Sequence, residues 1–271
     1  MLIWIPSRDR ADKQIAYNNL PDSLKPYTYI ACPEAQVDAY REHNPTANLF
    51  PVPGEHERIA KKRQYLLEHS TDNNIIYLDD DVGFNARREG TAHQLFMATD
   101  EEKTAAFLLL NSWLDEGIVH CSLSSREGNN WCKLDWTEAH RCVRALAYRR
   151  DVLMKEGVRF DRNELMEDYD VCLQLLELGY PNRVSYRYCS GQPTSNTAGG
   201  CSTYRTKELQ EQCSNRLAEL HPKFVRVCEK KTKGAWKNEF DGVRIDVRVA
   251  WKKAYTSSKP QRDVIDGPMS K

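Results

Sequence analysis

The chain has 271 residues, of which 40% are hydrophobic and 29% are charged, so it is long enough for a buried core and too apolar for a disordered chain. Its 39 basic and 39 acidic residues cancel overall but are unevenly distributed. Residues 221–262 contain twelve Lys and Arg against four Asp and Glu, which gives this segment a charge of +8 and the remainder −8.

Short apolar runs alternate with helical patterns in the first third of the chain. Residues 2–5, 28–32 and 74–78 are predicted as buried strands, and residues 34–42 and 57–69 as the helices between them. In the helix at 57–69, Ile59, Leu66 and Leu67 are expected to face inward and Lys61, Lys62 and Arg63 to lie on another face. This order predicts a parallel sheet with right-handed crossovers, in which ligands bind at the carboxyl ends of the strands.

The later elements form a mixed pattern. Helices are predicted at 101–116, 151–155, 167–178 and 206–220, and strands at 118–123, 142–148, 182–188 and 243–249. Thr206 is expected to cap its helix, and the strand at 243–249 to be half-buried with Arg244, Asp246 and Arg248 on a polar outer face. Residues 192–202 are expected to form a mobile loop, and the tail to fray from about residue 259.

Three consecutive carboxylates, Asp79, Asp80 and Asp81, follow the apolar strand at 74–78. Because like charges this close repel strongly, a cation is expected beside them. In an extended chain Asp79 and Asp81 point the same way, so these two can share a metal ion. Oxygen donors with no His or Cys nearby favour Mg(II) or Mn(II). The alternative interpretation is that the three aspartates form a solvated turn without a metal ion.

A second acidic group, Glu167, Asp168 and Asp170, opens the helix predicted at 167–178. Carboxylates at a helix N-terminus are favoured by the helix dipole, so capping alone is the simpler interpretation. Asp168 is a candidate general base on the condition that this helix start faces the metal.

Three cationic segments are candidates for binding phosphate. Ser7, Arg8 and Arg10 follow the first strand, and Lys61 to Arg63 lie on the helix before the acidic strand end. The third segment, residues 199–205, is expected to hold phosphate through backbone N–H groups, or to be a flexible connection.

The nine cysteines include no CxxC pair, and they are expected to be reduced core thiols in a cytosolic protein. The spacing of the seven histidines and the cysteines does not indicate a zinc site. The N-terminus lacks the pattern of a signal peptide, and no run approaches the length of a membrane span, so a cytoplasmic location is expected.

Together, several of these segments resemble the GT-A glycosyltransferases. Residues 61–64 and 74–82 resemble the stretch before and through their DxD motif, and residues 145–153, 157–161, 167–170 and 178–180 resemble the later half of family-two enzymes. Residues 5–8 and 199–205 make the chain most similar to phage enzymes that glycosylate hydroxymethylated pyrimidines in DNA, the TET/JBP-associated glycosyltransferase group. The resemblance covers residues 2–190, and the chain departs from it in having a crowded DDD.

The resemblance implies an α/β fold of the GT-A type, with a Rossmann-like mixed sheet flanked by helices. Residues 1–220 would form the catalytic domain, and residues 221–271 a basic extension packed on it. A nucleotide-diphosphate sugar, of which a UDP-sugar is the first expectation, would be the donor, and Mn(II) or Mg(II) the cofactor.

Asp79 and Asp81 would bind the metal, and Asp168, beside Glu167, would be the catalytic base. The groups expected to bind the nucleotide sugar are Pro6, Ser7, Arg8, Arg10, Arg63, Asp79 and Asp80. The loop expected to contact phosphate or acceptor contains Gly199, Gly200, Ser202, Tyr204 and Arg205.

The basic extension interleaves cations with Phe224, Trp236, Phe240, Trp251 and Tyr255, a pattern typical of binding to DNA backbones and bases. A hydroxymethylated pyrimidine in phage DNA, modified in the cytoplasm of the infected host, is therefore the expected acceptor. The residues expected to bind DNA are Lys230, Lys231, Lys233, Trp236, Lys237, Arg244, Arg248, Trp251 and Lys252. The alternatives are that these aromatics pack in a core, that the acceptor is a carbohydrate or lipid-linked molecule, that the protein is a non-catalytic DNA-binding module, or that it is a nucleotidyltransferase.

Overall fold

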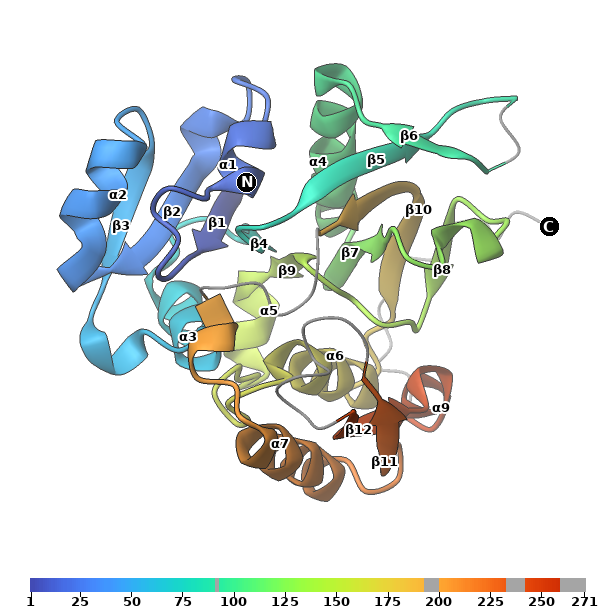
Figure 1. The fold of residues 1–271 in the computed structure, drawn as a ribbon. Coiled ribbons are helices and arrows are strands. Elements are labelled where there is room, and N and C mark those ends of the chain that lie inside the picture. The colour runs from blue at the N-terminus through green and yellow to red at the C-terminus, as the bar shows by residue number, and fades with distance from the viewer. Residues whose placement is uncertain (91–92, 193–199, 233–241, 259–271) are drawn as a thin grey trace.

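A ten-stranded mixed sheet forms the centre of the computed structural model, which describes residues 1–90, 93–192, 200–232 and 242–258 (Figure 1). Its strand order is β3-β2-β1-β4-β9-β7-β10-β5-β6, with β8 paired to β10. The strands are β1 (Leu2–Pro6), β2 (Thr28–Pro33), β3 (Asn48–Val52), β4 (Asn74–Leu78), β5 (Gly83–Arg87), β6 (Leu95–Met97), β7 (His120–Ser125), β8 (Trp136–Glu138), β9 (Ala145–Arg149) and β10 (Asn182–Gly191).

Helices cover both faces of this sheet. They are α1 (Ile15–Asn19), α2 (Val37–His43), α3 (Ile59–His69), α4 (Asp100–Asp115), α5 (Arg150–Lys155), α6 (Glu167–Glu177), α7 (Lys207–Leu220) and α9 (Trp251–Thr256). Short 3-10 turns lie at Lys25–Tyr27, Glu34–Gln36, Gly54–His56, Asn129–Trp131 and Gly200–Thr203. In the described part of the chain, no helix combines the length and the apolar character that crossing a membrane requires.

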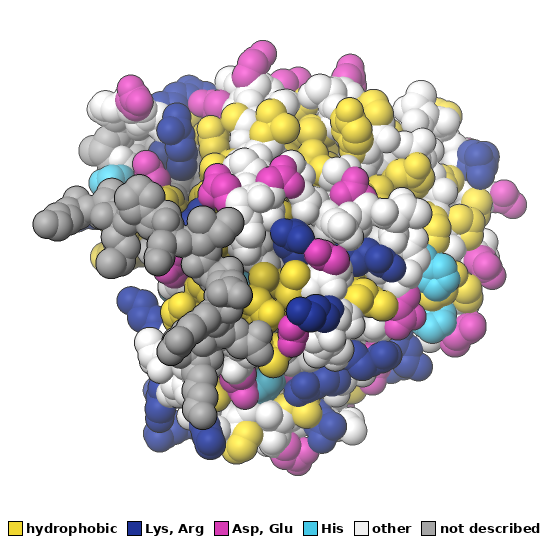
Figure 2. Space-filling view, turned by 180° about the vertical axis from the view of Figure 1, so that it is seen from behind, with side chains coloured by type: hydrophobic (Ala, Val, Ile, Leu, Met, Phe, Trp, Pro, Cys, Tyr) yellow, Lys and Arg dark blue, Asp and Glu magenta, His cyan; other side chains and the backbone are white. Residues whose placement is uncertain are grey.

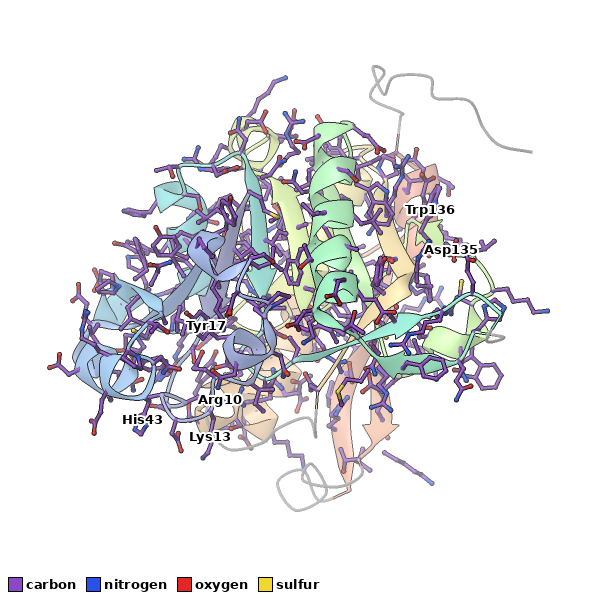
Figure 3. The ribbon with its side chains drawn as sticks, turned by 90° about the horizontal axis from the view of Figure 1, so that it is seen from above. Arg10, Lys13, Tyr17, His43, Asp135 and Trp136 are labelled. Carbon is purple, nitrogen blue, oxygen red and sulfur yellow. The ribbon has the colours of Figure 1, made fainter. Side chains whose placement is uncertain are left out.

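The alternation of side chains along the central strands divides the core into two layers. Trp4, Ile75 and Tyr77 pack with residues of α3, α5, α6 and α7. Ile3 and Ile76 point to the opposite face and pack with residues of α1, α2 and α4. Figure 3 shows α4 lying along the sheet, with the Arg10 loop and Trp136 at distant parts of the molecule.

The strand order reverses between β1 and β4. β1 pairs in parallel with both β2 and β4, and β2 pairs in parallel with β3. The chain therefore travels outward from β1 to β3 and returns to the other side of β1 for β4. The carboxyl ends of β1 and β4 form a topological switch point, where open α/β sheets bind ligands. The predicted parallel arrangement is confirmed here, and β9, antiparallel to both β4 and β7, makes the sheet mixed as expected.

Some predicted features are wrong in detail. The helix expected at 34–42 is a 3-10 turn followed by α2. Lys62 and Arg63 of α3 are 1% and 3% exposed and point into the molecule, because their charged ends find partners there, whereas Lys61 is exposed. Several elements were not predicted, because they are short, as α1, β6, β8 and α9 are, or interrupted by Pro or Gly, as β3 and β5 are, or highly charged, as the strand at 225–231 is.

The C-terminal segment packs against the body through a hairpin of β11 (Val225–Lys231) and β12 (Val243–Val249). Phe224, Val225, Val247 and Ala254 belong to the same core cluster as Tyr77. Arg248 is exposed, but Asp246 is only 4% exposed, so the polar face of β12 does not simply face solvent. Figure 2, seen from behind, shows Lys and Arg side chains spread along the lower part of the molecule. The division at residue 220 stays a prediction, and the tail from residue 259 lies outside the described residues.

Candidate functional site

A cavity of about 430 Å³ lies at the carboxyl ends of β1 and β4. Most residues that the sequence indicated line this one space: Pro6, Ser7, Arg8, Arg10, Arg63, Asp79, Asp80, Asp81, Glu167, Asp168, Gly200, Ser202, Tyr204, Arg205, Lys230 and Arg244. Of the other candidates, Lys231, Arg248, Trp251 and Lys252 are not among the lining residues. Gly199, Lys233, Trp236 and Lys237 lie outside the described residues, as do residues 193–198 of the loop expected to be mobile.

The three consecutive aspartates are divided between two arginines. Asp79 Oδ1 accepts a hydrogen bond of 2.7 Å from Arg63, while Asp80 Oδ1 and Asp81 Oδ2 lie 2.5 and 3.1 Å from Arg10 Nη1. The expected cation is therefore partly supplied by the protein. Asp79 and Asp81 pair with different arginines, because the chain leaves the extended conformation after Leu78 and turns at Asp80 and Asp81, and their sharing of a metal ion stays a prediction.

Asp80 anchors the loop that follows β1. Its carboxylate accepts a hydrogen bond of 2.6 Å from Ser7 Oγ, and Ser7 Oγ lies 2.8 Å from both Tyr40 Oη and Gln14 Nε2. Burial raises the pKa of Asp80, but Arg10 and Ser7 oppose this by stabilising its charge. Tyr40 and Gln14 were not singled out from the sequence, because they contribute to the site through Ser7.

Lys62 supports the same loop from below. Its ammonium group donates a hydrogen bond of 2.6 Å to the carbonyl of Ser7 and lies 3.4 Å from that of Ala31. Burial lowers the pKa of Lys62 to about 8. A positive charge buried beneath the end of β1 favours an anion in the cavity above it.

Arg63 joins the two acidic groups that the sequence singled out. Its guanidinium donates a hydrogen bond of 2.6 Å to Glu167 and the bond to Asp79, so the end of β4 and the start of α6 share one cation. Burial raises the pKa of Asp79 to about 6 and that of Glu167 to about 7, although Arg63 lowers both. Asp168, at the same helix start, lines the cavity together with the three aspartates, and its role as base stays a prediction.

Asp168 is held differently from its neighbour Glu167. The ion pair of Asp168 is with Arg141, at 3.8 Å, and its side chain is 19% exposed, against 7% for Glu167. The guanidinium of Arg141 lies 4.2 Å from the centre of the Tyr169 ring, which fixes its position. Arg141 and Tyr169 both line the cavity and gave no motif by which the sequence could reveal them.

Two residues of the cavity lining have strained backbone. Arg144 and Met166 have positive φ angles of 59° and 61°, in the left-handed region that residues other than Gly, Asn, Asp and His disfavour. Such residues cost about 1–3 kcal/mol each and cluster at functional sites. Met166 directly precedes Glu167 and Asp168, so the strained turn aims the start of α6 at the cavity.

In the segment at 200–205, three backbone N–H groups are already bonded within the protein, and phosphate binding by this segment stays a prediction. The N–H of Gly200 bonds to the Arg8 carbonyl, and those of Tyr204 and Arg205 bond to the Cys201 carbonyl. Gly200 instead allows close packing, since a Cβ there would lie 3.4 Å from Cζ of Arg10, and its φ is +61°. Among the described residues, this segment therefore contributes side chains to the cavity.

Two cations of the C-terminal hairpin reach the cavity. Lys230 and Arg244 form ion pairs of 3.1 and 2.8 Å with Asp246, and all three residues line the space. Trp251 instead packs on Tyr169, with ring centres 5.4 Å apart, as in the alternative where the aromatics form a core. Lys231, Arg248 and Lys252 are exposed outside the cavity.

The charge of the cavity favours an anionic ligand. Its lining contains nine Lys and Arg side chains and seven Asp and Glu side chains, an excess of two positive charges. The acids concentrate at the end of β4 and the start of α6, and cations surround them. This combination suits a diphosphate together with a cation bound to the carboxylates.

Residues 1–200 match the family described as TET-Associated Glycosyltransferase. The chain belongs to this family. Its GT-A fold is shared with a mannosyltransferase from Pyrobaculum calidifontis, solved with GDP-mannose and Mn²⁺, with a TM-score of 0.53, 14% identity, and coverage of 89% of this chain and 68% of that one. It is also similar to glucosyl-3-phosphoglycerate synthase from Mycobacterium tuberculosis, solved with Mn²⁺, UDP-glucose and phosphoglyceric acid, with a TM-score of 0.50, 12% identity, and coverage of 81% and 78%. No curated protein matches the chain.

Proposed function

We propose that this glycosyltransferase moves a sugar from a nucleotide-diphosphate sugar, with a UDP-sugar as the first candidate, to the hydroxyl group of a hydroxymethylated pyrimidine in phage DNA. The observation that carries the proposal is the convergence of the β1 loop, the aspartates after β4 and the start of α6 on one cavity. Membership of the TET-associated family supports both the transfer and the DNA acceptor.

The donor would lie over the ends of β1 and β4. Ser7, Arg8 and Arg10 are placed to hold the nucleotide and diphosphate, and Lys62 adds positive charge from below. Arg63 and Arg10 are already paired with carboxylates, so they hold those carboxylates in place as well as attracting the donor. Asp80, enclosed by Ser7 and Arg10, would position the donor loop.

The residues present fit a divalent cation of the Mn(II) or Mg(II) type. Asp79 and Asp81 offer oxygen donors on the cavity wall, and burial raises the pKa of Asp79 despite Arg63, so an added cation there would favour its charged form. When bound, such a cation would neutralise the charge that develops on the leaving diphosphate. Mn²⁺ accompanies the donor in both neighbouring structures.

Asp168 would act on the acceptor. Its carboxylate takes the proton of the acceptor hydroxyl while that oxygen forms a bond to the anomeric carbon, and the bond from this carbon to the diphosphate breaks, with its electron pair leaving on the diphosphate oxygen. Glu167 is tied to Arg63 and less exposed, so it orients this cation and leaves Asp168 as the base. Direct displacement of this kind inverts the anomeric centre.

The hairpin and α9 would hold the DNA. Lys230 and Arg244 at the cavity and Lys231, Arg248 and Lys252 outside it provide cations that neutralise backbone phosphates without reading sequence. Lys233, Trp236 and Lys237, which lie outside the described residues, belong to the same proposed surface. A base inside a duplex must leave the stack to reach the cavity.

The test is to incubate the protein with Mn(II), a panel of nucleotide sugars, and DNA with or without hydroxymethylated pyrimidines, and then to measure nucleoside masses after digestion. The proposal predicts a mass increase of one sugar on hydroxymethylated DNA only, and its loss in Asp81→Asn. Asp22→Asn, at an exposed aspartate remote from the cavity lining, is the matched control and should retain the product. Transfer to a carbohydrate with none to DNA would contradict the acceptor.

A further inference from the structure

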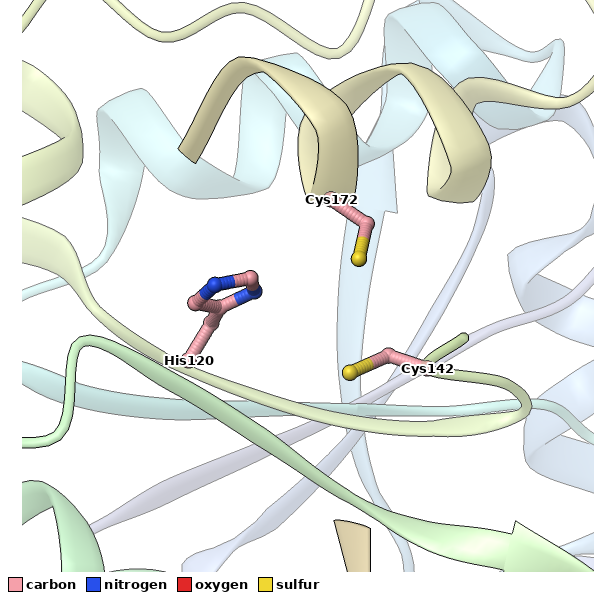
Figure 4. A group of neighbouring side chains, drawn as sticks. All are labelled: His120, Cys142 and Cys172. Atoms are coloured by element: carbon pink, nitrogen blue, oxygen red, sulfur yellow. The ribbon is translucent and has the colours of Figure 1, made fainter. Parts of the chain in front are cut away.

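A second polar cluster lies buried beneath α6, apart from the cavity. It consists of His120 on β7, Cys142 in the segment before β9, and Cys172 on α6 (Figure 4). Their ligand atoms all lie within 4.8 Å of one another, and the residues are 0%, 2% and 0% exposed. The spacing of these residues along the chain does not indicate a zinc site, because they come from three separate elements that meet only in the fold.

His120 presents a lone pair to this cluster. Its Nε2 lies 3.1 Å from the carbonyl oxygen of Tyr180. Because a carbonyl only accepts hydrogen bonds, Nε2 carries the proton and Nδ1 carries the lone pair. Nδ1 is buried and has no hydrogen-bond partner, and Figure 4 shows the ring and both sulfur atoms directed toward a common space. A histidine fixed in this way by a carbonyl is the arrangement that metal-binding histidines use.

The two sulfurs share a neighbour in the amide of Asn182, and Cys172 Sγ also donates a hydrogen bond of 3.6 Å to the carbonyl of His140. Asn182 Nδ2 lies 3.3 Å from each Sγ, and the amide is held in orientation because its Oδ1 accepts a hydrogen bond of 2.9 Å from the N–H of His140. Ser122, two residues after His120 and thus on the same face of β7, also has a buried hydroxyl without a partner. Unpartnered polar atoms in a core are costly, so their gathering around one space indicates an occupant.

We propose that His120 Nδ1, Cys142 Sγ and Cys172 Sγ bind one zinc ion, with the hydroxyl of Ser122 or a water as the fourth ligand. Binding would form two Zn–S bonds and one Zn–N bond and release the two thiol protons to solvent. Tetrahedral zinc with bonds of about 2.3 Å to sulfur and 2.0–2.1 Å to nitrogen sets ligand atoms about 3.5–3.8 Å apart, so the cluster contracts by roughly 1 Å on binding. Thiolates and imidazole select zinc over the hard ions expected at Asp79 and Asp81.

The ion would position the start of α6. Cys172 lies four residues after Asp168, so the two side chains share a face of the helix one turn apart. Zinc would tie this face to β7 and to the segment before β9. It is a structural ion, since its protein ligands enclose it away from the cavity.

The test is the metal content of the full-length protein, purified without metal-affinity chromatography and measured by plasma mass spectrometry. One equivalent of zinc per chain is expected, with its loss in Cys142→Ser and in Cys172→Ser. Cys189→Ser, at another fully buried cysteine outside the cluster, is the matched control and should retain one equivalent.

Cobalt substitution gives a second measurement that a site of carboxylates cannot imitate. Co(II) bound by thiolates shows a strong near-ultraviolet charge-transfer band, which should appear in the wild type and in Asp81→Asn and be weakened in each cysteine variant. A protein without zinc that takes up no Co(II), a band unchanged in Cys142→Ser and Cys172→Ser, or alkylation and mass analysis showing a Cys142–Cys172 disulfide would each overturn the proposal.

Discussion

The two polar clusters of this protein differ in where their residues lie in the sequence and in which groups pair with them. The aspartates after β4 are consecutive in sequence, line an open cavity, and are paired with Arg10 and Arg63. His120, Cys142 and Cys172 are far apart in sequence, fully enclosed, and include a nitrogen without a partner. Hard oxygen donors beside a cavity suit an exchangeable ion that acts with a substrate, whereas soft donors in a core suit an ion that stabilises the fold.

The largest expected effect concerns the open cluster. Asp168→Asn removes the proposed base while keeping the size of the side chain, so kcat should fall roughly 10³-fold with little change in Tm. Transfer rates under saturating donor and thermal melting curves measure the two quantities. Asp22→Asn is the control. A rate within a few-fold of the wild type would assign the base elsewhere.

Arg63 tests how much of the carboxylate charge the protein itself neutralises, without a metal. Arg63→Gln leaves the buried Glu167 and the partly buried Asp79 without their shared cation, so it should lower the free energy of unfolding by about 3 kcal/mol. The exposed pair of Arg159 with Asp161 is the comparison, and Arg159→Gln should cost less than about 1 kcal/mol. Urea denaturation measures both, and equal losses would contradict this account of Arg63.

The open cluster should also respond to pH. The pKa of Asp79 is raised to about 6, so protons compete with Mn(II) below that pH, and binding should be about tenfold weaker at pH 5 than at pH 7. Titration calorimetry at the two pH values tests this.

Without metal, the native state holds more protons on Asp79 and Glu167 than the unfolded chain does between about pH 4 and 7, so this contribution to stability falls as pH rises. A stability that instead rises with pH over this range, in both the wild type and Asp79→Asn, would contradict the assignment.

The smallest effect concerns the hairpin and α9. Arg248→Ala and Lys252→Ala each remove one proposed phosphate contact, so each should weaken DNA binding a few-fold and lower the salt slope by about 0.9 on duplex DNA. Lys155→Ala, at an exposed lysine of α5, should change neither quantity. Fluorescence anisotropy across a salt series provides the measurement, and identical slopes in all variants would remove these cations from the DNA surface.

The sequence predicts the open cluster well because its features are local. The apolar strand at 74–78, the acids that follow it and the polar loop after β1 fix a parallel sheet edge, and that edge fixes which side chains meet. Arg141 and Tyr169 were missed as site residues because their placement depends on a loop and on helix packing, and neither leaves a periodic signal. The turn at Asp80 likewise overrode the extended geometry assumed for Asp79 and Asp81.

The buried cluster escapes prediction for a related reason. His120, Cys142 and Cys172 meet because β7, the segment before β9, and α6 pack together, and each residue alone is compatible with an ordinary core position. Ligand spacing along the chain detects sites formed by one hairpin or one helix. It cannot detect a site assembled from three elements.

The central claim is that the cavity transfers a sugar to DNA, and it is tested most directly by the stoichiometry of the reaction. With Mn(II), a productive donor and hydroxymethylated DNA, the account predicts one nucleoside diphosphate released for each base that gains a sugar, with both products lost in Asp168→Asn. Release of nucleoside diphosphate with no sugar on any base would contradict the claim.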